Sequence, residues 1–276
     1  MTTRNPKDTA MATDPGTSDD AGRTSGHDPG RGAIDLGALA RIDGDEMVQL
    51  ATTEYDRLLT LLAGLDADEW QRPTACEAWD IRRMVAHLLG AAEANASMRE
   101  NAAQLLRGRR RVRGTGRPLV DGINEVQVDD RDHLSPAELC EQLEAIAPKA
   151  IRGRYRTPGP MRRVKVPGPL GPIRLGHLVD VVYLRDQWMH RVDVVRATGG
   201  QLELTAEHDG RIVMDVAAEW ARSHDQPVSL ILTGPAGGRF THRGGGPSLH
   251  LDAVDFCLAL SGRERAEGLL AVEVVF

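Results

Sequence analysis

Apolar residues recur at helical spacing in four stretches of this sequence, with polar residues between them. The first stretch predicts a helix over residues 44–63 that Gly64 would cap, and the second predicts a helix that begins near Asp80. The apolar stripe of the second helix weakens at Asn95, and the Gly- and Arg-rich residues 108–120 are typical of a loop. Two amphipathic helices therefore precede a long connection.

Two further helices follow this connection. Residues 135–138 read Ser-Pro-Ala-Glu, which is typical of a helix start, and the helix is expected to extend to about Lys149. Pro and Gly crowd residues 158–172, which indicates an irregular loop. The fourth helix is predicted over residues 175–198, with the glycine pair at 199–200 ending it. Four amphipathic helices with long connections predict a four-helix bundle.

After Gly200 the pattern changes from long helices to short segments of mixed type. Helical periodicity predicts helices over residues 207–223 and 253–261. Alternating or β-favouring residues, separated by turns rich in Gly and Pro, predict strands at 228–233, 239–243, 249–251 and 269–276. This mixture indicates a small α+β domain.

The start of the chain differs from the rest in composition. Residues 1–33 are rich in Thr, Asp, Gly, Pro and Ser and have almost no large apolar side chains. Such a segment cannot offset its ordering entropy by burial, so it is predicted to be disordered. The fold class is therefore α plus α+β, with a disordered tail at 1–33, a helical bundle at 34–200 and a small α+β domain at 201–276.

Charge and cysteine content narrow the partners and the compartment. The formal net charge is −6, and the basic run at residues 107–117 has no interleaved aromatic residues, so no nucleic-acid partner is expected. Three widely spaced cysteines without a Cys-x-x-Cys pair favour a reducing, cytoplasmic compartment. No apolar run approaches the roughly 18 residues needed to span a membrane, and no signal peptide is apparent.

A carboxylate and an imidazole share one face of the fourth predicted helix. Asp186 and His190 are four residues apart, so their side chains leave the same face one turn apart. Polar groups on an inward face need either a hydrogen-bonded partner or a shared metal ion. The apolar residues that mark this face as inward are Leu175, Val179, Val182 and Met189.

A second imidazole could complete a metal site. His87 falls within or beside the apolar stripe of the second predicted helix. Together with Asp186 and His190 it would supply two imidazoles and one carboxylate with an open fourth position, which matches a catalytic divalent-metal site. Zinc is the default ion, and iron or nickel would also accept these ligands. Spacing alone leaves open the alternative that the three are polar residues with separate partners.

Three stretches resemble a known family. Residues 76–88 resemble the Cys-x-x-Trp…His-Leu signature of the mycothiol-dependent maleylpyruvate isomerase family, within the DinB-like bundle superfamily. Residues 185–193 resemble that family's second signature, and residues 233–263 resemble the sterol-carrier-like domain often appended to it. The resemblance covers residues 40–276 and implies a DinB-like metal-binding four-helix bundle followed by a sterol-carrier-like domain.

The family's zinc ligands are a His on the second helix and a Glu-x-x-x-His pair on the last. Carried over to this sequence, they fall on His87, Asp186 and His190. Asp186 departs from the family's Glu and is one methylene shorter. The helix must therefore approach the ion more closely, or the carboxylate must bind the ion through water. The resemblance therefore supports a metal site more strongly than isomerase activity. The cofactors it implies are a divalent metal, zinc first, and mycothiol.

The implied function is a metal-dependent enzyme that directs a low-molecular-weight thiol at an electrophilic substrate. In an isomerase the thiolate adds to a conjugated double bond, which rotates before the thiol leaves. In an S-transferase the thiol stays attached. The alternatives are a non-catalytic protein that binds metal or a small ligand, and a metal-dependent hydrolase that uses bound water.

Several neighbours of these residues are further candidates. Arg185 and Arg191 flank the ligand pair and could hold carboxylates of the cofactor or substrate, with pairing to Asp or Glu as the alternative. Cys76 precedes a helix start, where a thiolate is stabilised, but a packing role beside Trp79 is favoured. Asp193 could support the metal site or cap a neighbouring helix.

Overall fold

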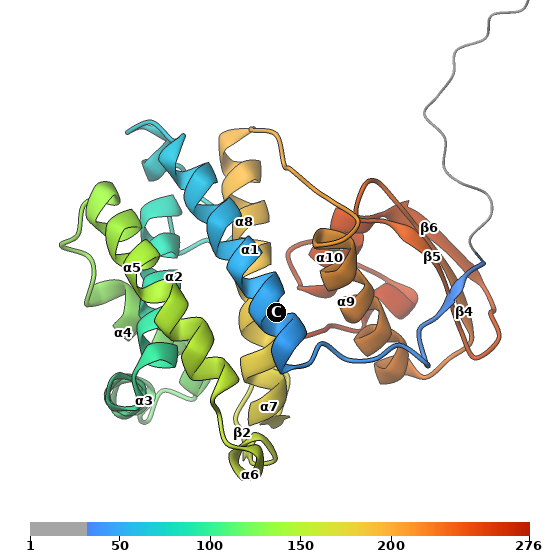
Figure 1. Ribbon diagram of the computed structural model, residues 1–276, viewed down its shortest axis with the longest axis horizontal. Helices are drawn as coiled ribbons and strands as arrows, with labels where there is room; N and C mark the ends of the chain where they lie inside the picture. Colours follow the sequence, from blue (N-terminus) through green and yellow to red (C-terminus); the bar gives the residue numbers. More distant parts are fainter. Residues whose placement is uncertain (1–31) are drawn as a thin grey trace, which may run out of the picture. The chain divides into compact units, whose positions relative to one another are not determined.

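Four long helices form a bundle, as the apolar pattern predicted (Figure 1). In this computed structural model, which describes residues 32–276, the four are α1 (Gly44–Ala63), α2 (Ile81–Ala96), α5 (Pro136–Tyr155) and α8 (Tyr183–Thr198). Helices α1 and α2 each pack against both α5 and α8, so the four apolar stripes face one another.

Capping residues fix several ends of these helices at the positions predicted from the sequence. The side chain of Asp80 caps α2 by accepting a hydrogen bond from the backbone N–H of Arg83. Ser135 and Glu138 form a reciprocal capping box at the start of α5. Gly199 ends α8 in the left-handed conformation, with φ of 69°. These predicted boundaries are confirmed.

A helical hairpin that the sequence analysis did not predict lies between α2 and α5. It consists of α3 (Met98–Val112) and α4 (Leu119–Asp129), so the loop predicted at residues 108–120 is wrong at both of its ends. Arg107 of α3 donates to both carboxylate oxygens of Asp130 at the end of α4, at 2.9 and 2.5 Å. Arginines that look like a solvated loop in the sequence thus join two helices.

Glycine allows close helix contacts at two places in the bundle. A Cβ atom added at Gly122 of α4 would lie 2.4 Å from the carbonyl oxygen of Gly108 in α3. One added at Gly153 of α5 would lie 1.9 Å from the carbonyl oxygen of Asn95 in α2. Both distances are far below van der Waals contact, so any larger residue would push the helices apart.

The segment between α5 and α8 is more ordered than predicted. Helix α5 continues past its expected end at Lys149 to Tyr155, and short elements occupy much of the predicted irregular loop. The last helix begins at Leu175 as predicted, but a π-helical turn at Leu178–Val182 interrupts it before α8. The short elements are α6 (Gly159–Arg162), β2 (Lys165–Val166), β3 (Ile173–Arg174) and α7 (Leu175–His177).

The C-terminal part forms a four-stranded sheet in the order β1-β5-β4-β6, with α9 and α10 on one face (Figure 1). Strand β4 pairs antiparallel with β5 and parallel with β6, and alternate β4 residues are buried. The predicted helices and three of the predicted strands are confirmed. Their bounds are α9 Asp209–His224, β4 Val228–Thr233, β5 Gly238–His242, β6 Ser248–Asp252 and α10 Ala253–Leu260.

Two details of this sheet differ from expectation. An edge strand, β1 (Ile34–Asp35), comes from far earlier in the chain and pairs in parallel with β5. The strand predicted at residues 269–276 is wrong, because the segment forms a 3₁₀ turn at Gly268–Ala271. Its backbone groups find other partners: the Trp220 indole donates to the carbonyl oxygen of Leu269 at 2.8 Å.

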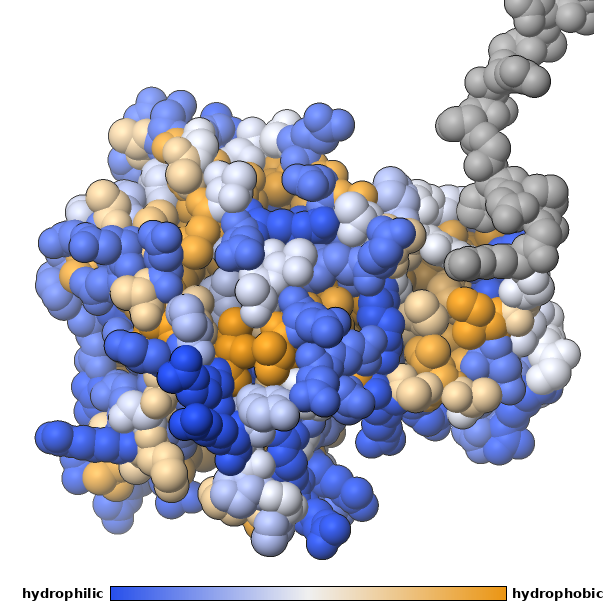
Figure 2. Space-filling view, in the orientation of Figure 1, coloured by the Kyte–Doolittle hydropathy of each residue, from blue (hydrophilic) through white to orange (hydrophobic). Residues whose placement is uncertain are grey.

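The helical and α+β parts share one hydrophobic core. Trp188 of α8 and Trp220 of α9 are fully buried in the same cluster of apolar side chains. On the face shown in Figure 2, hydrophilic side chains predominate and hydrophobic ones lie in small groups between them. Residues from Ala33 onward form one compact unit, and the boundary placed at residue 200 remains a prediction.

Two further expectations concern the ends and the environment of the chain. The disordered segment predicted at residues 1–33 falls almost wholly on residues 1–31, which lie outside the described residues. Within residues 32–276, no helix combines the length and the apolar character required to cross a membrane.

Candidate metal centre

The structure brings His87, Asp186 and His190 to one point between α2 and α8. The Nε2 atom of His87 lies 3.5 Å from Oδ2 of Asp186, and the Nε2 atom of His190 lies 3.3 Å from Oδ1 of the same carboxylate. One ligand atom from each residue lies within 4.8 Å of the others. The one-turn spacing on α8 supplies two of the groups, and the packing of α2 against α8 supplies the third.

Each imidazole is held by a partner at its other nitrogen. The Nδ1 atom of His87 lies 2.8 Å from Oε1 of Gln127 on α4, and the Nδ1 atom of His190 lies 3.0 Å from Oδ2 of Asp193. Both rings are at least nine-tenths buried. Partners of this kind fix ring orientation and leave Nε2 as the atom that faces Asp186.

Asp193 connects the cluster to the C-terminal part of the chain. The guanidinium of Arg263, which follows α10, donates to Oδ1 and Oδ2 of Asp193 at 2.8 and 2.7 Å. A cavity of about 250 Å³ adjoins this pair and is also lined by Thr74 and Arg196. The bidentate pair keeps a carboxylate in place behind His190 and beside this cavity.

Charge within the cluster shifts the pKa values of its members. Burial alone would raise the pKa of the Asp186 carboxyl, but His190 and His87 hold it well below its usual range. Burial would lower the pKa of His190, but the carboxylates of Asp186 and Asp193 raise it to about 9. The cluster therefore favours an ionised carboxylate next to positive charge.

Trp79 and Cys76 line the same region from the segment before α2. The Trp79 ring stacks on His87, with ring centroids 5.0 Å apart and planes 28° apart. Burial, with smaller contributions from Asp193 and Asp186, raises the pKa of the Cys76 thiol to about 11. A thiol with that pKa is not a thiolate near neutral pH, which agrees with the packing role favoured for Cys76.

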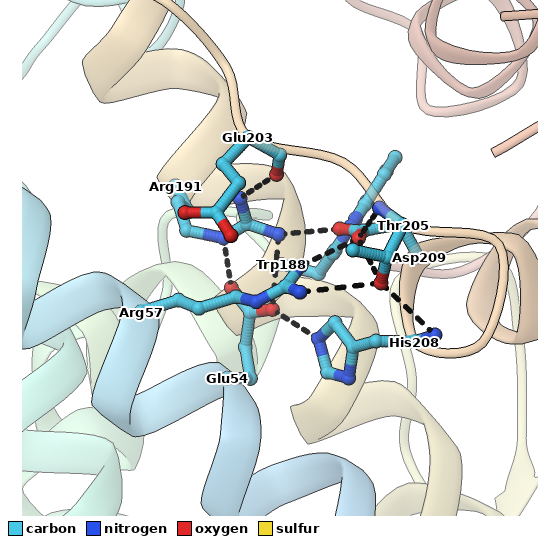
Figure 3. Close-up of polar contacts among 8 residues, drawn as sticks. All are labelled: Glu54, Arg57, Trp188, Arg191, Glu203, Thr205, His208 and Asp209. Atoms are coloured by element: carbon cyan, nitrogen blue, oxygen red, sulfur yellow. Dashed lines mark hydrogen bonds and ion pairs between the residues drawn. The ribbon is translucent and has the colours of Figure 1, made fainter. Parts of the chain in front are cut away.

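The two arginines suggested for cofactor binding lie elsewhere. Arg185 is fully buried and pairs with Asp215 at 2.6 Å and Glu219 at 3.0 Å, both on α9. Arg191 pairs with Glu54 at 2.7 Å and Asp209 at 2.6 Å (Figure 3). The structure does not bring either guanidinium to the His87 cluster, and both follow the alternative of pairing with carboxylates.

Figure 3 shows a second buried group of titratable side chains, around Glu54, His208 and Asp209. It joins α1 and α8 to the start of α9. Arg57 donates to Asp209 at 2.6 Å, and Arg191 contacts both carboxylates, so two guanidinium groups already balance the two acids. This charge balance favours a structural ion-pair network over a metal site.

The residues of the His87 cluster fit a divalent metal ion. Two imidazoles and a carboxylate are the donor set of many catalytic zinc sites, and both Nε2 atoms face Asp186. Asp186 keeps 24% of its side chain exposed, so the cluster is reachable from solvent. Iron or nickel would accept the same donors.

Two polar residues behind the cluster escaped the sequence analysis. Gln127 and Gln104 are almost fully buried on α4 and α3, the hairpin that was not predicted. A short signal was present, because Gln127 stands between two valines, Val126 and Val128. Such a residue needs a buried hydrogen-bond partner if the stretch is a helix.

Two imidazoles and a carboxylate converge between the helices of this bundle, a place where many helical-bundle proteins build ligand and metal sites. The family model for the mycothiol maleylpyruvate isomerase N-terminal domain matches residues 51–195, more than half of the chain. The chain therefore belongs to the mycothiol maleylpyruvate isomerase family, as the sequence resemblance predicted. A search of curated proteins finds no match.

Two solved structures support the fold. A crystal structure of the mycothiol-dependent maleylpyruvate isomerase superimposes with a TM-score of 0.53 at 17% identity, covering 84% of this chain and 92% of that one. A histidine-to-alanine mutant of that isomerase gives a TM-score of 0.52 at 16% identity with the same coverage. The alignment extends over both the bundle and most of the remaining chain, which confirms the predicted fold class.

Proposed function

We propose that His87, Asp186 and His190 hold a divalent metal ion, zinc first, and that the protein uses this ion with a low-molecular-weight thiol to attack an electrophilic substrate. The observation that carries the proposal is the convergence of these three side chains from two helices, with both Nε2 atoms facing one carboxylate. Membership of a mycothiol-dependent family supports mycothiol as the thiol. The chemistry that such an ion supplies is a lowered pKa of the bound thiol, so that thiolate forms near neutral pH.

The protein's own side chains would prepare this chemistry. Metal binding would require deprotonated Nε2 atoms on His87 and His190, so it would release protons from the cluster, and Asp186 contributes the negative charge that favours a cation. Asp193 accepts the Nδ1–H of His190, and it stays ionised because His190 and Arg263 lower its pKa despite burial. The ring of Trp79 covers one side of His87 and limits access of water there.

The reaction type divides into two versions of the same thiol addition. In the isomerase version the thiolate sulfur forms a bond to one carbon of the double bond. The former double bond then rotates, and the carbon–sulfur bond breaks to release the thiol and restore the double bond. In the S-transferase version the new carbon–sulfur bond persists, and the neighbouring carbon of the former double bond takes up the proton that the thiol lost. Asp186 is one methylene shorter than the Glu of the isomerase motif, which changes the reach of the carboxylate, so family membership does not by itself select the isomerase version.

Metal content and turnover of the purified full-length chain test the proposal. We expect about one zinc ion per chain after zinc loading and removal of excess ion, with strong loss in His87→Ala and His190→Ala, because each variant removes one of three ligands. The matched control is His250→Ala, since His250 is exposed on β6 outside the cluster. Turnover is followed with mycothiol and maleylpyruvate, the substrate named for the solved isomerase.

The outcomes separate the candidates. Isomerised product with unchanged mycothiol supports the isomerase, whereas a mycothiol conjugate supports the S-transferase. Bound zinc without either product favours a non-catalytic binding protein. Equal metal content in the wild type and in His190→Ala contradicts the metal site itself.

A further inference from the structure

A chain of buried hydrogen bonds runs from His87 into the α3–α4 hairpin. The Nδ1 atom of His87 lies 2.8 Å from Oε1 of Gln127, and Nε2 of Gln127 donates to Oε1 of Gln104 at 2.9 Å. The amide nitrogen of Gln104 then donates to the carbonyl oxygen of Gly90 at 2.9 Å and to Oε1 of Glu100 at 3.0 Å. The chain thus ends on two oxygen atoms.

The terminal groups give this chain one direction. A backbone carbonyl and an ionised carboxylate can only accept, so the end of Gln104 that faces Gly90 and Glu100 must be its NH₂ group. Its oxygen therefore faces Gln127, which must present its own NH₂ there. The oxygen of Gln127 is left for His87, and an oxygen at 2.8 Å from Nδ1 requires a proton on that nitrogen.

Reversing the chain would be costly because it is buried and tightly packed. Gln104 and Gln127 are 1% and 4% exposed, so no bulk water replaces a lost partner. A Cβ atom at Gly90 would lie 2.6 Å from Cβ of Gln127, which shows that glycine is needed for α4 to come this close to α2. Arg131 also donates to the backbone carbonyl of Gln127 at 2.7 Å, which holds this residue in place.

We propose that Gln127 and Gln104 are positioning residues that keep a proton on Nδ1 of His87 and so reserve its Nε2 atom for the metal ion. A flipped amide would offer an N–H to Nδ1 and favour the opposite tautomer, in which Nε2 carries the proton and cannot act as a ligand. The hydrogen-bonded series from His87 through Gln127 to Gln104, called the relay below, prevents this flip at Gln104, its member farthest from the imidazole.

The relay also makes the two histidine ligands unequal. His190 is held by Asp193, an ionised carboxylate, whereas His87 is held by a neutral amide. A carboxylate partner raises the basicity of an imidazole ligand more than an amide does. The glutamine pair is thus the group that selects the tautomer of His87, whereas Asp193 has this role for His190.

Nitrogen-15 NMR of the histidine rings in the full-length, metal-free protein tests the inference directly. We expect a proton on Nδ1 of His87 in the wild type, and a population with bare Nδ1 in both Gln127→Met and Gln104→Met. Methionine has a similar volume and no hydrogen-bonding amide, so packing is largely kept. Gln104→Leu takes the place of Gln104→Met if the latter does not fold.

Zinc titration against a competing chelator gives the second readout, and this arm rests on the proposed function. We expect Gln127→Met to bind zinc roughly 10- to 100-fold more weakly, as is usual for partners of a metal-bound imidazole, with a smaller loss in Gln104→Met. Gln187→Met is the matched control, because Gln187 is a buried glutamine on α8 whose amide nitrogen has no partner among the described residues.

The two readouts fail separately. The relay is overturned if Nδ1 of His87 carries no proton in the wild type. It is also overturned if Gln104→Met changes neither the protonation of Nδ1 nor the zinc affinity. Absence of zinc binding in the wild type contradicts the proposed function and leaves the NMR measurement of the relay intact. An equal loss of zinc affinity in Gln187→Met and Gln104→Met would also overturn the relay, since the effect would then come from general packing.

Discussion

Single residues decide whether the cluster can act as a ligand set. Asp186 and His190 were identified from their spacing, and the structure brings both together with His87. Arg185 and Arg191 have the same sequence proximity, yet their neighbouring positions on α8 point them toward α9 and α1. Adjacent residues on a helix diverge by about 100°, so closeness in sequence to a ligand says little about closeness in space.

Asp193→Asn is expected to weaken both the fold and the metal site. Asp193 accepts from His190 and from both nitrogen donors of Arg263, and an amide in its place turns one of these contacts into a clash of donors. Loss of a buried partner of this kind should lower the free energy of unfolding by about 3 kcal/mol and zinc affinity by roughly tenfold or more. Urea denaturation and zinc titration measure the two effects.

The control for Asp193→Asn is Glu264→Gln. Glu264 pairs with Arg196 at 2.9 Å, but both side chains are more than 40% exposed. Such a pair contributes at most about 1 kcal/mol, so the control should stay close to the wild type. Equal losses in the two variants would refute a special role for the Asp193–Arg263 pair.

At the scale of elements, the α3–α4 hairpin is the part that the sequence analysis missed. Its helices are joined by ion pairs and by a glycine contact, neither of which leaves a long apolar stripe. The hairpin carries Gln104 and Gln127, so the missed element is also the one that supports His87. The π-helical turn before α8 likewise left no signal in the apolar periodicity.

Gly122→Ala is expected to destabilise the hairpin. The new Cβ atom would lie 2.4 Å from the carbonyl oxygen of Gly108, and backbone atoms cannot move aside cheaply. We expect the free energy of unfolding to fall by about 1 to 3 kcal/mol, despite the better helix propensity of alanine. Gly159→Ala is the control, because nothing lies within 4 Å of its added Cβ atom. The explanation fails if the two variants are equally stable in urea.

At the scale of the whole molecule, buried ion pairs join the bundle to α9. Glu219 of α9 contacts His177 at 3.1 Å and Arg185 at 3.0 Å. The network in Figure 3 makes a second connection, from α1 and α8 to the start of α9. Such pairs require their partners to remain charged, so the connection between these parts should depend on pH.

Glu219 gives this dependence a measurable window. Burial would raise its pKa, but His177 and Arg185 lower it to about 2, below the ordinary value of 4.5. A carboxyl whose pKa is lower in the folded state stabilises the protein above pH 4.5, and this contribution is lost as pH falls toward 2. Between pH 5 and pH 3, the free energy of unfolding should therefore fall by about 2 kcal/mol less in Glu219→Gln than in the wild type.

Urea denaturation at the two pH values measures this difference. Glu207→Gln is the control, because Glu207 is exposed and removal of its charge should leave the difference between the two pH values close to that of the wild type. An identical pH dependence in Glu219→Gln and the wild type would show that this ion pair does not contribute to acid stability.

The amino-acid sequence was enough to predict the four bundle helices, several of their ends, three of the strands and the position of Asp186 and His190 on one face of α8. These features depend on residues a few positions apart, where periodicity and capping act directly. The place of His87 beside an apolar stripe suggested it as the third ligand, and the family signatures strengthened that prediction and identified the family to which the chain belongs.

Contacts between side chains on different elements follow from the packing of those elements in three dimensions. This packing places His87 beside Asp186, Arg263 behind Asp193, and Gln104 and Gln127 behind His87. It also pairs β1 with a strand just over 200 positions later in the chain. These contacts depend on helix rotation, on glycine-mediated close approach and on charges balanced between distant residues. None of these produces a periodic pattern of apolar and polar residues, because each is a property of two surfaces in contact and not of one segment.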